Sequence, residues 1–536
     1  MTSTIVYRQG EKPLHEYLRQ HAVERPQKPA INWYGAEISF SELDRLSDAF
    51  AARLHERGIQ KGDRVALFLQ NSPQYVIAYL GSQKLGAIVC ACSPLFKQFE
   101  LETQLSDMGA RALVAADVLY PVVEQVLPTV EIEHLFLTSY SELLPDHPTV
   151  HVPGEVSEAK RPPVDGATDF MEALRTFEGD VPRPEISMSD TAAMSYTSGS
   201  TGRPKGAMLP YSQALFKSSV MAEAYDIQAS DIMLAVAPLY HIAGMSAGIC
   251  IPVYTGATTV LLFRFDPLSV LEAIDRNKVT FWYSVTPMNI AVMEHPEASR
   301  YRLDSLRLNI GTSFGIPLTE DRAKKWAAFT GGCLVAEAAY GLTETHTWDT
   351  CMPLDDIRWG THGKLSPGVQ CRIVDLDTRA EKARGEQGEI QLKGPGLFHG
   401  YWNNREAYED AFEGKWFCTG DIGVLDEDDY LTLLGRKKEM IKVSGYSVFP
   451  EDVETILCKH PDITQAVIVG VPHETKGEVV RAVLVMRKGA DASADDIIAW
   501  CRGNLSAYKV PQLVSFVDHL PTTPTGKVLR RLVKEL

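Results

Sequence analysis

Cysteine and long hydrophobic runs are both scarce in this sequence, and each scarcity excludes a class of protein. Nine cysteines in 536 residues are too few for a disulfide framework. The closest pair, Cys90 and Cys92, lacks a second pair of metal ligands, so we interpret both as buried small hydrophobic residues in a reducing compartment. No stretch approaches the roughly 20 apolar residues that cross a bilayer, and residues 1–13 contain no apolar signal core. We therefore expect a cytoplasmic protein without stable membrane insertion.

Positive charge is also in short supply. Lysine and arginine number 53 against 69 aspartates and glutamates, so the formal net charge is −16. Because an acidic chain repels nucleic acid, we expect no nucleic-acid partner, and any anionic ligand must be held by local positive groups. The chain does contain 45% hydrophobic and 23% charged residues, which is ordinary for a folded protein. This composition excludes intrinsic disorder.

Strand-like and helix-like segments alternate through the first half of the chain. The earliest example is an apolar strand at 64–69, a helix that runs from a Ser72 cap to about Leu85, and a second apolar strand at 87–92. Such alternation predicts parallel sheets covered by helices. Residues 154–184 are rich in Glu, Pro and Asp, so we expect them to form a surface connection.

The sequence pattern changes near Gly360, where short strands between Gly and Pro turns predict a small, mostly antiparallel β-barrel-like unit. The C-terminal part of the chain predicts a compact α+β domain. We place the boundary at the charged stretch 435–438, because a core does not tolerate such charge unpaired. The predicted fold class is therefore α/β, with a large N-terminal domain of parallel α/β sheets (1–435), a hinge (436–438) and a small C-terminal domain (439–536).

The strongest local signal is a loop at 196–206, with the sequence Tyr-Thr-Ser-Gly-Ser-Thr-Gly-Arg-Pro-Lys-Gly. It follows a short apolar segment, and we expect a helix after it. Its glycines and hydroxyl groups can turn several N–H and O–H donors onto one polyanion, and Arg203 and Lys205 add charge for phosphate oxygens. It is not a Walker A loop, because Pro204 precedes the lysine and Gly206 follows it. The plainer alternative is a flexible Ser/Gly loop.

Further motifs follow this loop in order, and together they resemble the acyl-adenylate-forming (AMP-binding) superfamily. The likeness extends from about Leu14 to Arg531, and within the superfamily the chain looks like stand-alone acyl-CoA synthetases of the fatty-acid–CoA ligase type. The matching segments are, in chain order, 196–206, 238–241 (Pro-Leu-Tyr-His), 340–344 (Tyr-Gly-Leu-Thr-Glu), 385–390, 416–421, 435–446 and 524–527 (Pro-Thr-Gly-Lys).

The resemblance implies an ATP-dependent reaction in two halves. The carboxylate of an acid attacks the α-phosphate of ATP and pyrophosphate leaves, after which the thiol of CoA takes the acyl group and releases AMP. The implied cofactors are ATP, Mg²⁺ and CoA. Because two anions must meet, the site has to supply positive charge that follows the transition state. The implied catalytic residues are Lys527, Glu344, Thr343, His241 and Lys442.

In the first half-reaction, the resemblance implies that Lys527 bridges the carboxylate and the α-phosphate, while Glu344 holds Mg²⁺. Thr343 is expected to hydrogen-bond the α-phosphate, Tyr340 to stack on adenine, and Asp421 to accept both ribose hydroxyls. The implied ATP- and AMP-binding residues are Thr197, Ser198, Gly199, Ser200, Thr201, Gly202, Lys205, Gly315, Ile316, Tyr340, Gly341, Thr343, Asp421, Arg436 and Lys527.

In the second half-reaction, the resemblance implies that the C-terminal domain is mobile and rotates about Lys438. The Lys527 loop then leaves the site and the opposite face of the domain enters it. Gly445 suits the passage of a pantetheine arm, because it carries no side chain to block the path. The implied CoA-binding residues are Lys442, Ser444, Gly445 and Tyr446.

The identity of the acid is the most open question. The run Ala243–Met245 indicates a mainly apolar site, so a medium- or long-chain fatty acid is our first expectation, whereas Ser313 and His346 leave an aromatic or hydroxylated acid open. Phe314 and Ile316 depart from the family pattern at the pocket wall. The implied acyl-pocket residues are Tyr240, His241, Met245, Ser313, Phe314, Gly315 and His346.

Several alternatives accompany this interpretation. His241 either contacts the acid and the metal–phosphate region or is a core histidine. The chain could load a carrier protein in trans rather than CoA, oxygenate an adenylate as luciferases do, or bind nucleotide as a regulator without turnover. Retention of Lys527, Glu344 and Asp421 argues against the last of these. The expected partners are the small-molecule acid, ATP and CoA, and a homodimer is left open.

Overall fold

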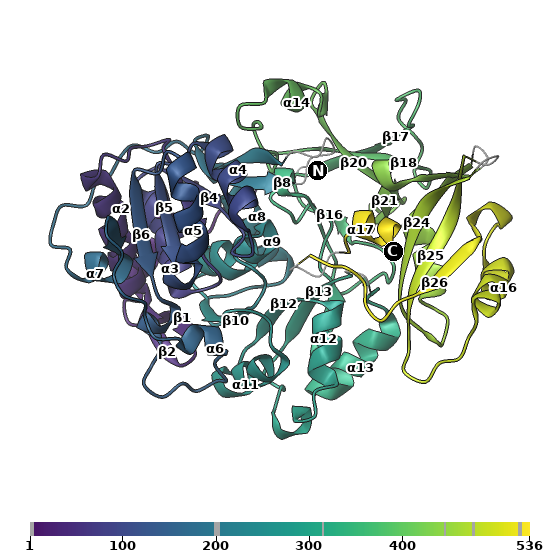
Figure 1. The fold of residues 1–536 in the computed structure, drawn as a ribbon, viewed down its shortest axis with the longest axis horizontal. Coiled ribbons are helices and arrows are strands. Elements are labelled where there is room, and N and C mark those ends of the chain that lie inside the picture. The colour runs from purple at the N-terminus through teal and green to yellow at the C-terminus, as the bar shows by residue number, and fades with distance from the viewer. Residues whose placement is uncertain (1–4, 198–203, 314–315, 444–445, 474–476, 524–527) are drawn as a thin grey trace.

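The computed structural model describes residues 5–197, 204–313, 316–443, 446–473, 477–523 and 528–536 of the 536-residue chain. Figure 1 shows two α/β blocks, coloured purple to blue and teal, followed by a green antiparallel sheet. The yellow C-terminal unit lies on the far side of the molecule from the first block, next to the green sheet. The fold is mixed α/β with parallel sheets and a separate small C-terminal domain, as the sequence predicts.

The first block is built on a sheet with the order β7-β6-β5-β3-β4-β8-β9, whose strands run parallel except for β9. Its strands are β3 (Arg64–Phe68), β4 (Ile88–Ala91), β5 (Ala112–Ala116), β6 (His134–Thr138), β7 (Ala167–Asp169), β8 (Thr191–Thr197) and β9 (Lys205–Pro210). Its helices are α2 (Phe40–Glu56), α3 (Pro73–Lys84), α4 (Gln98–Met108), α5 (Tyr120–Val126), α6 (Gly154–Ser157) and α7 (Phe170–Arg175). The predicted alternation of strand and helix is confirmed here.

The second block repeats this architecture around a sheet with the order β14-β13-β12-β10-β11-β1-β2, parallel except for β2. Its strands are β1 (Pro29–Trp33), β2 (Ala36–Ser39), β10 (Ile232–Ala235), β11 (Thr258–Leu261), β12 (Phe281–Val285), β13 (Leu308–Thr312) and β14 (Leu334–Glu337). Its helices are α1 (Leu14–Glu24), α8 (Tyr211–Ala224), α9 (Ile242–Met245), the π-helical turn η4 (Ser246–Cys250), α10 (Ile251–Thr255), α11 (Pro267–Asn277), α12 (Thr286–Met293) and α13 (Glu320–Thr330). Because β1 pairs with β11, the start of the chain is fastened to the second block.

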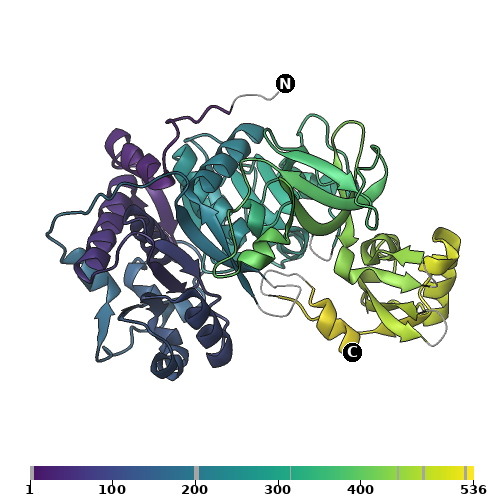
Figure 2. The same ribbon diagram turned by 90° about the horizontal axis from the view of Figure 1, so that it is seen from above.

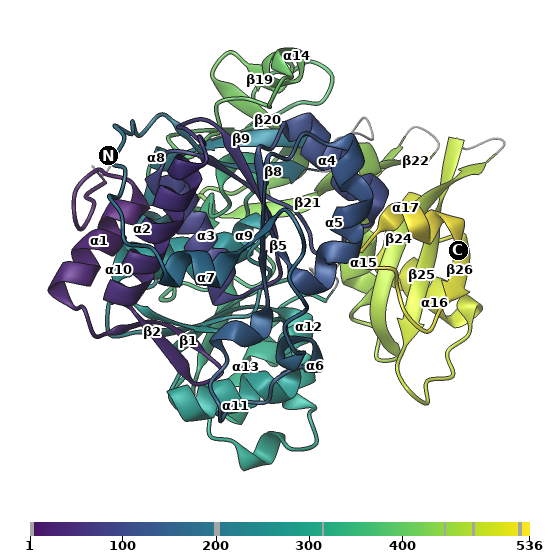
Figure 3. The same cartoon turned by 60° about the vertical axis from the view of Figure 1, so that its left-hand side comes forward.

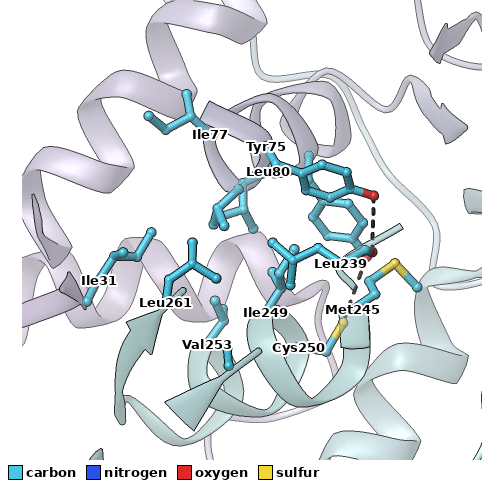
Figure 4. Packing of buried hydrophobic residues seen from close by; sticks show 14 of the residues in the cluster. Ile31, Tyr75, Ile77, Leu80, Leu239, Met245, Ile249, Cys250, Val253 and Leu261 are labelled. Atoms are coloured by element: carbon cyan, nitrogen blue, oxygen red, sulfur yellow. Dashed lines mark hydrogen bonds between the residues drawn. The ribbon is translucent and has the colours of Figure 1, made fainter. Parts of the chain in front are cut away.

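Helix α3 lies in the hydrophobic core that the two blocks share. Every residue of this helix is buried, so it has no solvent-facing side. Ser72 caps it by accepting the N–H of Tyr75, as predicted from the sequence. Figure 4 shows side chains of α3 packed against Leu239, Ile249 and Leu261 of the second block. Burial of this apolar surface holds the blocks together.

An antiparallel sheet follows, in the order β17-β18-β20-β19, with β21 paired to β20. Its strands are β17 (Gln370–Val374), β18 (Gln387–Lys393), β19 (Phe412–Glu413), β20 (Trp416–Leu425) and β21 (Leu431–Arg436), with α14 (Arg405–Glu409) in the β18–β19 connection; the short pair β15 (Thr350–Cys351) and β16 (Lys364–Leu365) precedes it. This sheet carries the chain from the parallel blocks to the C-terminal unit.

The C-terminal unit has its own sheet and its own core. The sheet order is β23-β22-β25-β24, and β26 adds to β25 in parallel. Its elements are β22 (Ile441–Val443), β23 (Tyr446–Val448), α15 (Pro450–Leu457), β24 (Ile463–His473), β25 (Gly477–Met486), α16 (Ala494–Asn504), β26 (Leu513–Phe516) and α17 (Arg530–Glu535). Figure 2 and Figure 3 show it projecting to one side of the body. Val480, Leu484 and Ile468 are fully or almost fully buried within it.

The structure corrects two expectations about local elements. The glycine loop is followed by strand β9 rather than by a helix, so it connects two antiparallel strands, β8 and β9. The segment 154–184 is not only a surface connection, because β7 pairs with β6 and α7 buries Phe170 and Leu174. The apolar residues of this helix sit among Glu and Pro residues, which hid its pattern in the sequence.

The closest pair of cysteines lies in the core of the first block, as the sequence predicts. Cys90 and Cys92 are free and buried, and burial raises the pKa of the Cys92 thiol to about 12, which makes it inert. Among the helices of the described ranges, none is both long and apolar enough to cross a membrane.

Candidate active site

A buried carboxylate, Asp421, sits where the antiparallel sheet meets the hinge segment. It lies on β20 directly across from Arg436 on β21, and the Arg436 Nε is 3.0 Å from Asp421 Oδ1. The Tyr340 hydroxyl donates to Asp421 Oδ2 over 2.8 Å. Asp421 is only 3% exposed, so these bonds act in a weakly screened environment. A carboxylate has about four lone-pair positions, which leaves acceptor capacity for ribose hydroxyls.

Ionisation within this group follows from burial and charge. Burial, and then the negative charge of Asp421, raise the pKa of Tyr340 well above its usual value, so its hydroxyl stays a donor. Burial by itself lowers the pKa of Arg436, but the nearby acidic groups, with Asp421 the strongest of them, together outweigh that effect and raise it. Arg436 is therefore a permanent cation beside the predicted nucleotide site.

The predicted metal ligand Glu344 lies in a short 3-10 turn, η6 (Thr343–Thr345), and is buried. The Tyr401 hydroxyl donates to Glu344 Oε1 over 2.8 Å. The backbone carbonyl of Glu344 accepts the Phe398 N–H at 2.8 Å and the Gln213 Nε2 at 3.0 Å. Side chain and backbone are thus both fixed, and Thr343 next to it is half-buried.

A left-handed turn follows η6. His346, Thr347 and Trp348 have φ values of 57°, 58° and 54°, a conformation that costs a non-glycine residue roughly 1–2 kcal/mol. A Cβ on Gly341 would lie 2.5 Å from the Thr347 Cα, so glycine is required there for the turn to pack. The Thr347 N–H donates to the Leu342 carbonyl over 2.8 Å.

A buried ion pair between Lys217 and Asp349 holds this left-handed turn in place. Lys217 Nζ on α8 is 2.7 Å from Asp349 Oδ1, and both side chains are almost inaccessible. The Thr345 hydroxyl donates to the same carboxylate, and the Asp349 N–H donates to the Tyr340 carbonyl over 2.9 Å. The pair therefore ties the turn to α8 and to the residue that contacts Asp421.

His346 is buried, with 2% of its surface exposed, and among the described residues neither ring nitrogen has a hydrogen-bond partner. Burial, and then the charge of Lys217, lower the pKa of His346 to about 3, so the ring is neutral near pH 7. Next to it, Trp348 donates its indole N–H to Ser246 over 2.7 Å and packs edge-on against Tyr283. The turn thus carries one unsatisfied polar group beside an aromatic wall.

The end of β13 carries the segment that departs from the family pattern. Glu337, at the end of β14, accepts the backbone N–H of Ser313 at 3.0 Å and its hydroxyl at 2.5 Å. Burial raises the pKa of Glu337 to about 7, although the two Ser313 bonds oppose the rise. Ile316 is buried, while Phe314 and Gly315 lie outside the described residues.

The described ends of the phosphate loop lie close to Glu344. Thr197 closes β8 and pairs with Lys205 at the start of β9. The Lys205 ammonium stands 4.8 Å from the ring centroid of Tyr401, the residue that bonds Glu344. Ser198, Gly199, Ser200, Thr201 and Gly202 fall outside the described residues.

Three of the predicted acyl-pocket residues, Tyr240, His241 and Met245, lie on α9 or directly before it. Gly244 has to be glycine because a Cβ there would lie 2.0 Å from the Pro238 carbonyl oxygen. Met245 is buried in the shared core (Figure 4), and Tyr240 is half-buried. His241 is exposed and caps α9 by accepting the Ala243 N–H at 3.4 Å. The alternative of a core histidine at 241 is therefore wrong, because the α9 start faces outward.

The hinge segment forms a 3-10 turn, η7 (Lys437–Glu439), with an ion pair on each side of Lys438. Lys437 Nζ lies 3.6 Å from Glu389 on β18, and Glu439 lies 3.0 Å from Arg530 Nε on α17. Lys438 is exposed. The turn is thus tied to the sheet before it and to the C-terminal helix after it.

Of the residues predicted for CoA, the structure describes Lys442 and the backbone of Tyr446. Lys442 is exposed on β22, and its backbone N–H donates to Glu478 Oε2 over 3.0 Å. Tyr446 begins β23 and pairs with Val443. Ser444, Gly445 and Lys527 lie outside the described residues.

Sequence reasoning missed several residues that contact the predicted site. Tyr401 and Gln213 bond Glu344, and the Lys217–Asp349 pair supports the turn beside it. Tyr401 is 57 positions from Glu344, so no local spacing signals the contact. Asp349 lies five residues beyond the 340–344 motif.

Comparison with known proteins shows the family of this chain. The family model described as AMP-binding enzyme matches residues 18–402, and the model described as AMP-binding enzyme C-terminal domain matches residues 452–527. A long-chain-fatty-acid–CoA ligase of Bacillus subtilis (strain 168) is 33% identical, over 98% of this chain and 94% of that protein.

Solved structures give the same result for the fold. The ATP-bound MatB of Rhodopseudomonas palustris superposes with a TM-score of 0.85 at 28% identity and covers 98% of this chain and 99% of its own. The anthranilate CoA ligase AuaEII, in complex with anthranoyl-AMP, superposes with a TM-score of 0.86 at 26% identity, covering 98% and 97%.

The chain belongs to the AMP-binding enzyme family. Within it, this protein is an acid–thiol ligase that forms acyl-CoA through an acyl-adenylate. Ligases of this family use ATP, Mg²⁺ and CoA.

Proposed function

We propose that this ligase activates a medium- or long-chain fatty acid and transfers it to CoA, with release of AMP and pyrophosphate. The observation that carries the proposal is the apolar wall beside the left-handed turn, where Trp348 packs on Tyr283. Met245 is also buried, and it directly precedes Ser246, which accepts the indole N–H of Trp348. Identity of 33% to a long-chain-fatty-acid–CoA ligase supports the same choice.

The proposed first half-reaction brings two anions together. Lys527 bridges the carboxylate and the α-phosphate, while His241 and Lys205 lie toward the phosphates. Asp421 and Arg436 hold the ribose, with Tyr340 against the adenine. These contacts position the reactants and stabilise the charge of the transition state, and they thereby accelerate adenylation. No protein nucleophile is needed.

The residues present fit Mg²⁺ as well. In the part of the chain that the structure describes, no group of three or more His, Cys, Asp and Glu side chains could hold a metal. Magnesium in nucleotide sites instead uses one or two protein carboxylates plus substrate phosphates, and Glu344 supplies one carboxylate next to the hydroxyl of Thr343. When bound, the ion neutralises charge on the phosphates.

The proposed second half-reaction needs a rotation about Lys438. The moving domain is 439–536, the hinge is 436–438, and the stationary body is 1–435. After rotation, Lys442 and the 444–446 segment line the path of the CoA thiol. The ion pairs of Lys437 and Glu439 on opposite sides of Lys438 support a pivot at this residue. A cytoplasmic location and a homodimer stay predictions.

An assay of pyrophosphate release over a panel of acids tests the proposal. The panel contains octanoate, palmitate, 4-hydroxybenzoate, 4-coumarate and malonate, each with and without CoA. We expect the highest kcat/KM for an aliphatic acid and stoichiometric consumption of CoA. A clear preference for an aryl or dicarboxylic acid would contradict the fatty-acid assignment, and adenylate formation without transfer to CoA would favour a carrier protein in trans.

Separate assays of the two half-reactions test the division of labour. Lys527→Ala should lower pyrophosphate exchange by about 10²–10³, because its charge is used only where carboxylate meets phosphate, and should still convert a supplied acyl-adenylate. Gly445→Leu should do the reverse, since its side chain blocks the pantetheine path. Equal slowing of both half-reactions by both variants would refute the two-conformation mechanism.

A second candidate is an aryl or otherwise substituted acid, and one observation favours it. The buried imidazole of His346 has no bonding partner among the described residues. A substrate hydroxyl or amine would satisfy this group, whereas an alkyl chain would not. The structural likeness to an anthranilate CoA ligase is compatible with this candidate.

A further inference from the structure

Tyr401 contacts two charged groups of the predicted site at once. Its hydroxyl donates to Glu344 Oε1 over 2.8 Å, and its ring centroid lies 4.8 Å from the Lys205 ammonium. Glu344 is the proposed metal ligand, and Lys205 stands at the end of the phosphate loop. One side chain therefore connects the acidic and the basic part of the site.

The backbone around Tyr401 is held in place independently of these contacts. Residues 398–402 run antiparallel to β9: the Trp402 N–H donates to the Gly206 carbonyl over 2.7 Å, and the Met208 N–H donates to the Gly400 carbonyl over 2.9 Å. Phe398 packs edge-on against Tyr401, with ring centroids 4.7 Å apart. The tyrosine is thus part of a rigid strand-like segment, which limits its own movement.

This arrangement keeps two opposite charges from neutralising each other. Within the described ranges, neither Glu344 nor Lys205 forms an ion pair with another side chain. A lysine and a glutamate this near to one tyrosine would gain energy by pairing directly. Instead the Lys205 ammonium lies over the ring of Tyr401, and the Tyr401 hydroxyl donates to Glu344 Oε1. The second carboxylate oxygen, Glu344 Oε2, takes no part in this hydrogen bond.

We propose that Tyr401 is a positioning residue that holds Glu344 and Lys205 apart, with the Glu344 carboxylate oriented for the metal of MgATP and the Lys205 ammonium for its phosphates. The proposal rests on the metal role that we propose for Glu344. It assigns to the hydroxyl a task in metal binding and to the ring a task in phosphate binding. The two tasks can be separated by substitution.

The test compares nucleotide binding with and without metal, by calorimetry. ATP is titrated in excess Mg²⁺ and again in EDTA, and the ratio of the two affinities measures the metal's contribution. Tyr401→Phe should lower that ratio about tenfold, the size of one hydrogen bond to a charged group, and should change the affinity in EDTA by less than about twofold. Tyr401→Leu should also weaken binding in EDTA, because Lys205 loses its ring.

Tyr408→Phe is the matched control. Tyr408 packs on the same Phe398 ring, with centroids 5.4 Å apart, but the Glu344 bond comes from Tyr401. It should behave as the wild type in both titrations.

Steady-state kinetics should show a raised KM for MgATP in Tyr401→Phe with a smaller change in kcat. If Tyr401→Phe fails to fold, Tyr401→His replaces it, because histidine keeps a planar ring with an N–H donor. Tyr401→His should then retain more of the Mg²⁺-to-EDTA affinity ratio than Tyr401→Leu does.

Glu344→Gln distinguishes this inference from the function on which it rests. If Glu344→Gln keeps the wild-type ratio, the metal role of Glu344 is wrong and Tyr401 has no metal ligand to position. If Glu344→Gln lowers the ratio and Tyr401→Phe does not, the metal role stands and the positioning role of Tyr401 is refuted. Equal losses in Mg²⁺ and in EDTA for Tyr401→Phe would also refute it, since they indicate a packing effect.

Discussion

The nucleotide end and the acyl end of the site differ in how their buried polar groups are satisfied. Asp421 accepts a hydrogen bond from Tyr340 and forms an ion pair with Arg436, and Glu344 accepts a hydrogen bond from Tyr401. His346, only two residues beyond Glu344, has neither nitrogen bonded among the described residues. The residues predicted to meet ATP are therefore held by protein contacts, whereas the imidazole predicted to lie near the acid has no such contact among the described residues.

The buried pair Lys217–Asp349 lies between the two ends, and breaking it should have the largest effect. Lys217→Met leaves the Asp349 carboxylate buried without its cation, which typically costs about 3–5 kcal/mol of unfolding free energy. The double variant Lys217→Met, Asp349→Leu removes both charges and should recover most of the loss. Urea unfolding of the two variants measures this. Equal destabilisation by both would show that packing, rather than the charge, sets the cost.

We expect the second-largest effect from the polar contacts of Asp421 at the nucleotide end. Asp421→Ala removes the acceptor for Tyr340, Arg436 and the ribose, and should weaken ATP binding by about 2–4 kcal/mol. KM for ATP should rise far more than kcat falls, because the contact is made in ground state and transition state alike. Asp428→Ala, on the exposed turn after β20, is the control. An unchanged KM would mean that the ribose lies elsewhere.

The buried carboxyl group of Glu337 should titrate near neutral pH, and the stability of the protein should change with it. Burial raises the pKa of Glu337 from its usual 4.5 to about 7, so the folded chain binds this proton more tightly than the unfolded chain does. Stability should therefore fall as pH rises from about 4.5 to about 7, by at most about 3 kcal/mol, and level off above that. Glu337→Gln should remove this decline.

Thermal unfolding of wild type and Glu337→Gln from pH 4.5 to 8 measures the difference. Subtraction is needed because buried histidines act in the opposite direction: burial lowers the pKa of His362 to about 4, so its contribution to stability is lost as pH falls below about 6.5. The exposed Glu124→Gln serves as the control. Parallel pH curves for Glu337→Gln and wild type would exclude a titrating carboxyl at this position.

The acyl end predicts the smallest effect. His346→Leu replaces an unbonded buried imidazole with an apolar side chain, which should shift the ratio of kcat/KM between octanoate and 4-hydroxybenzoate about tenfold toward octanoate. KM for ATP should not change. Thr347→Val, in the same left-handed turn, is the control for packing. An unchanged ratio would place the imidazole away from the acid.

The sequence predicted the elements of the fold better than their connections. Strand β3 and the Ser72-capped α3 agree with expectation to within a residue or two, because apolar runs and caps are local signals. The β9 strand after the phosphate loop was missed, because β8 and β9 satisfy each other's backbone across the loop. Helix α7 was missed because its apolar residues lie among polar ones.

By itself the sequence determined the family, the reaction and the cofactors, because the residues predicted to meet ATP occur as contiguous motifs whose spacing is readable along the chain. The tertiary structure alone decided what surrounds those motifs. Tyr401 meets Glu344, Lys217 meets Asp349 and Glu337 meets Ser313 across 57, 132 and 24 positions. Such contacts depend on burial and on which elements the fold brings side by side, and no local pattern carries either.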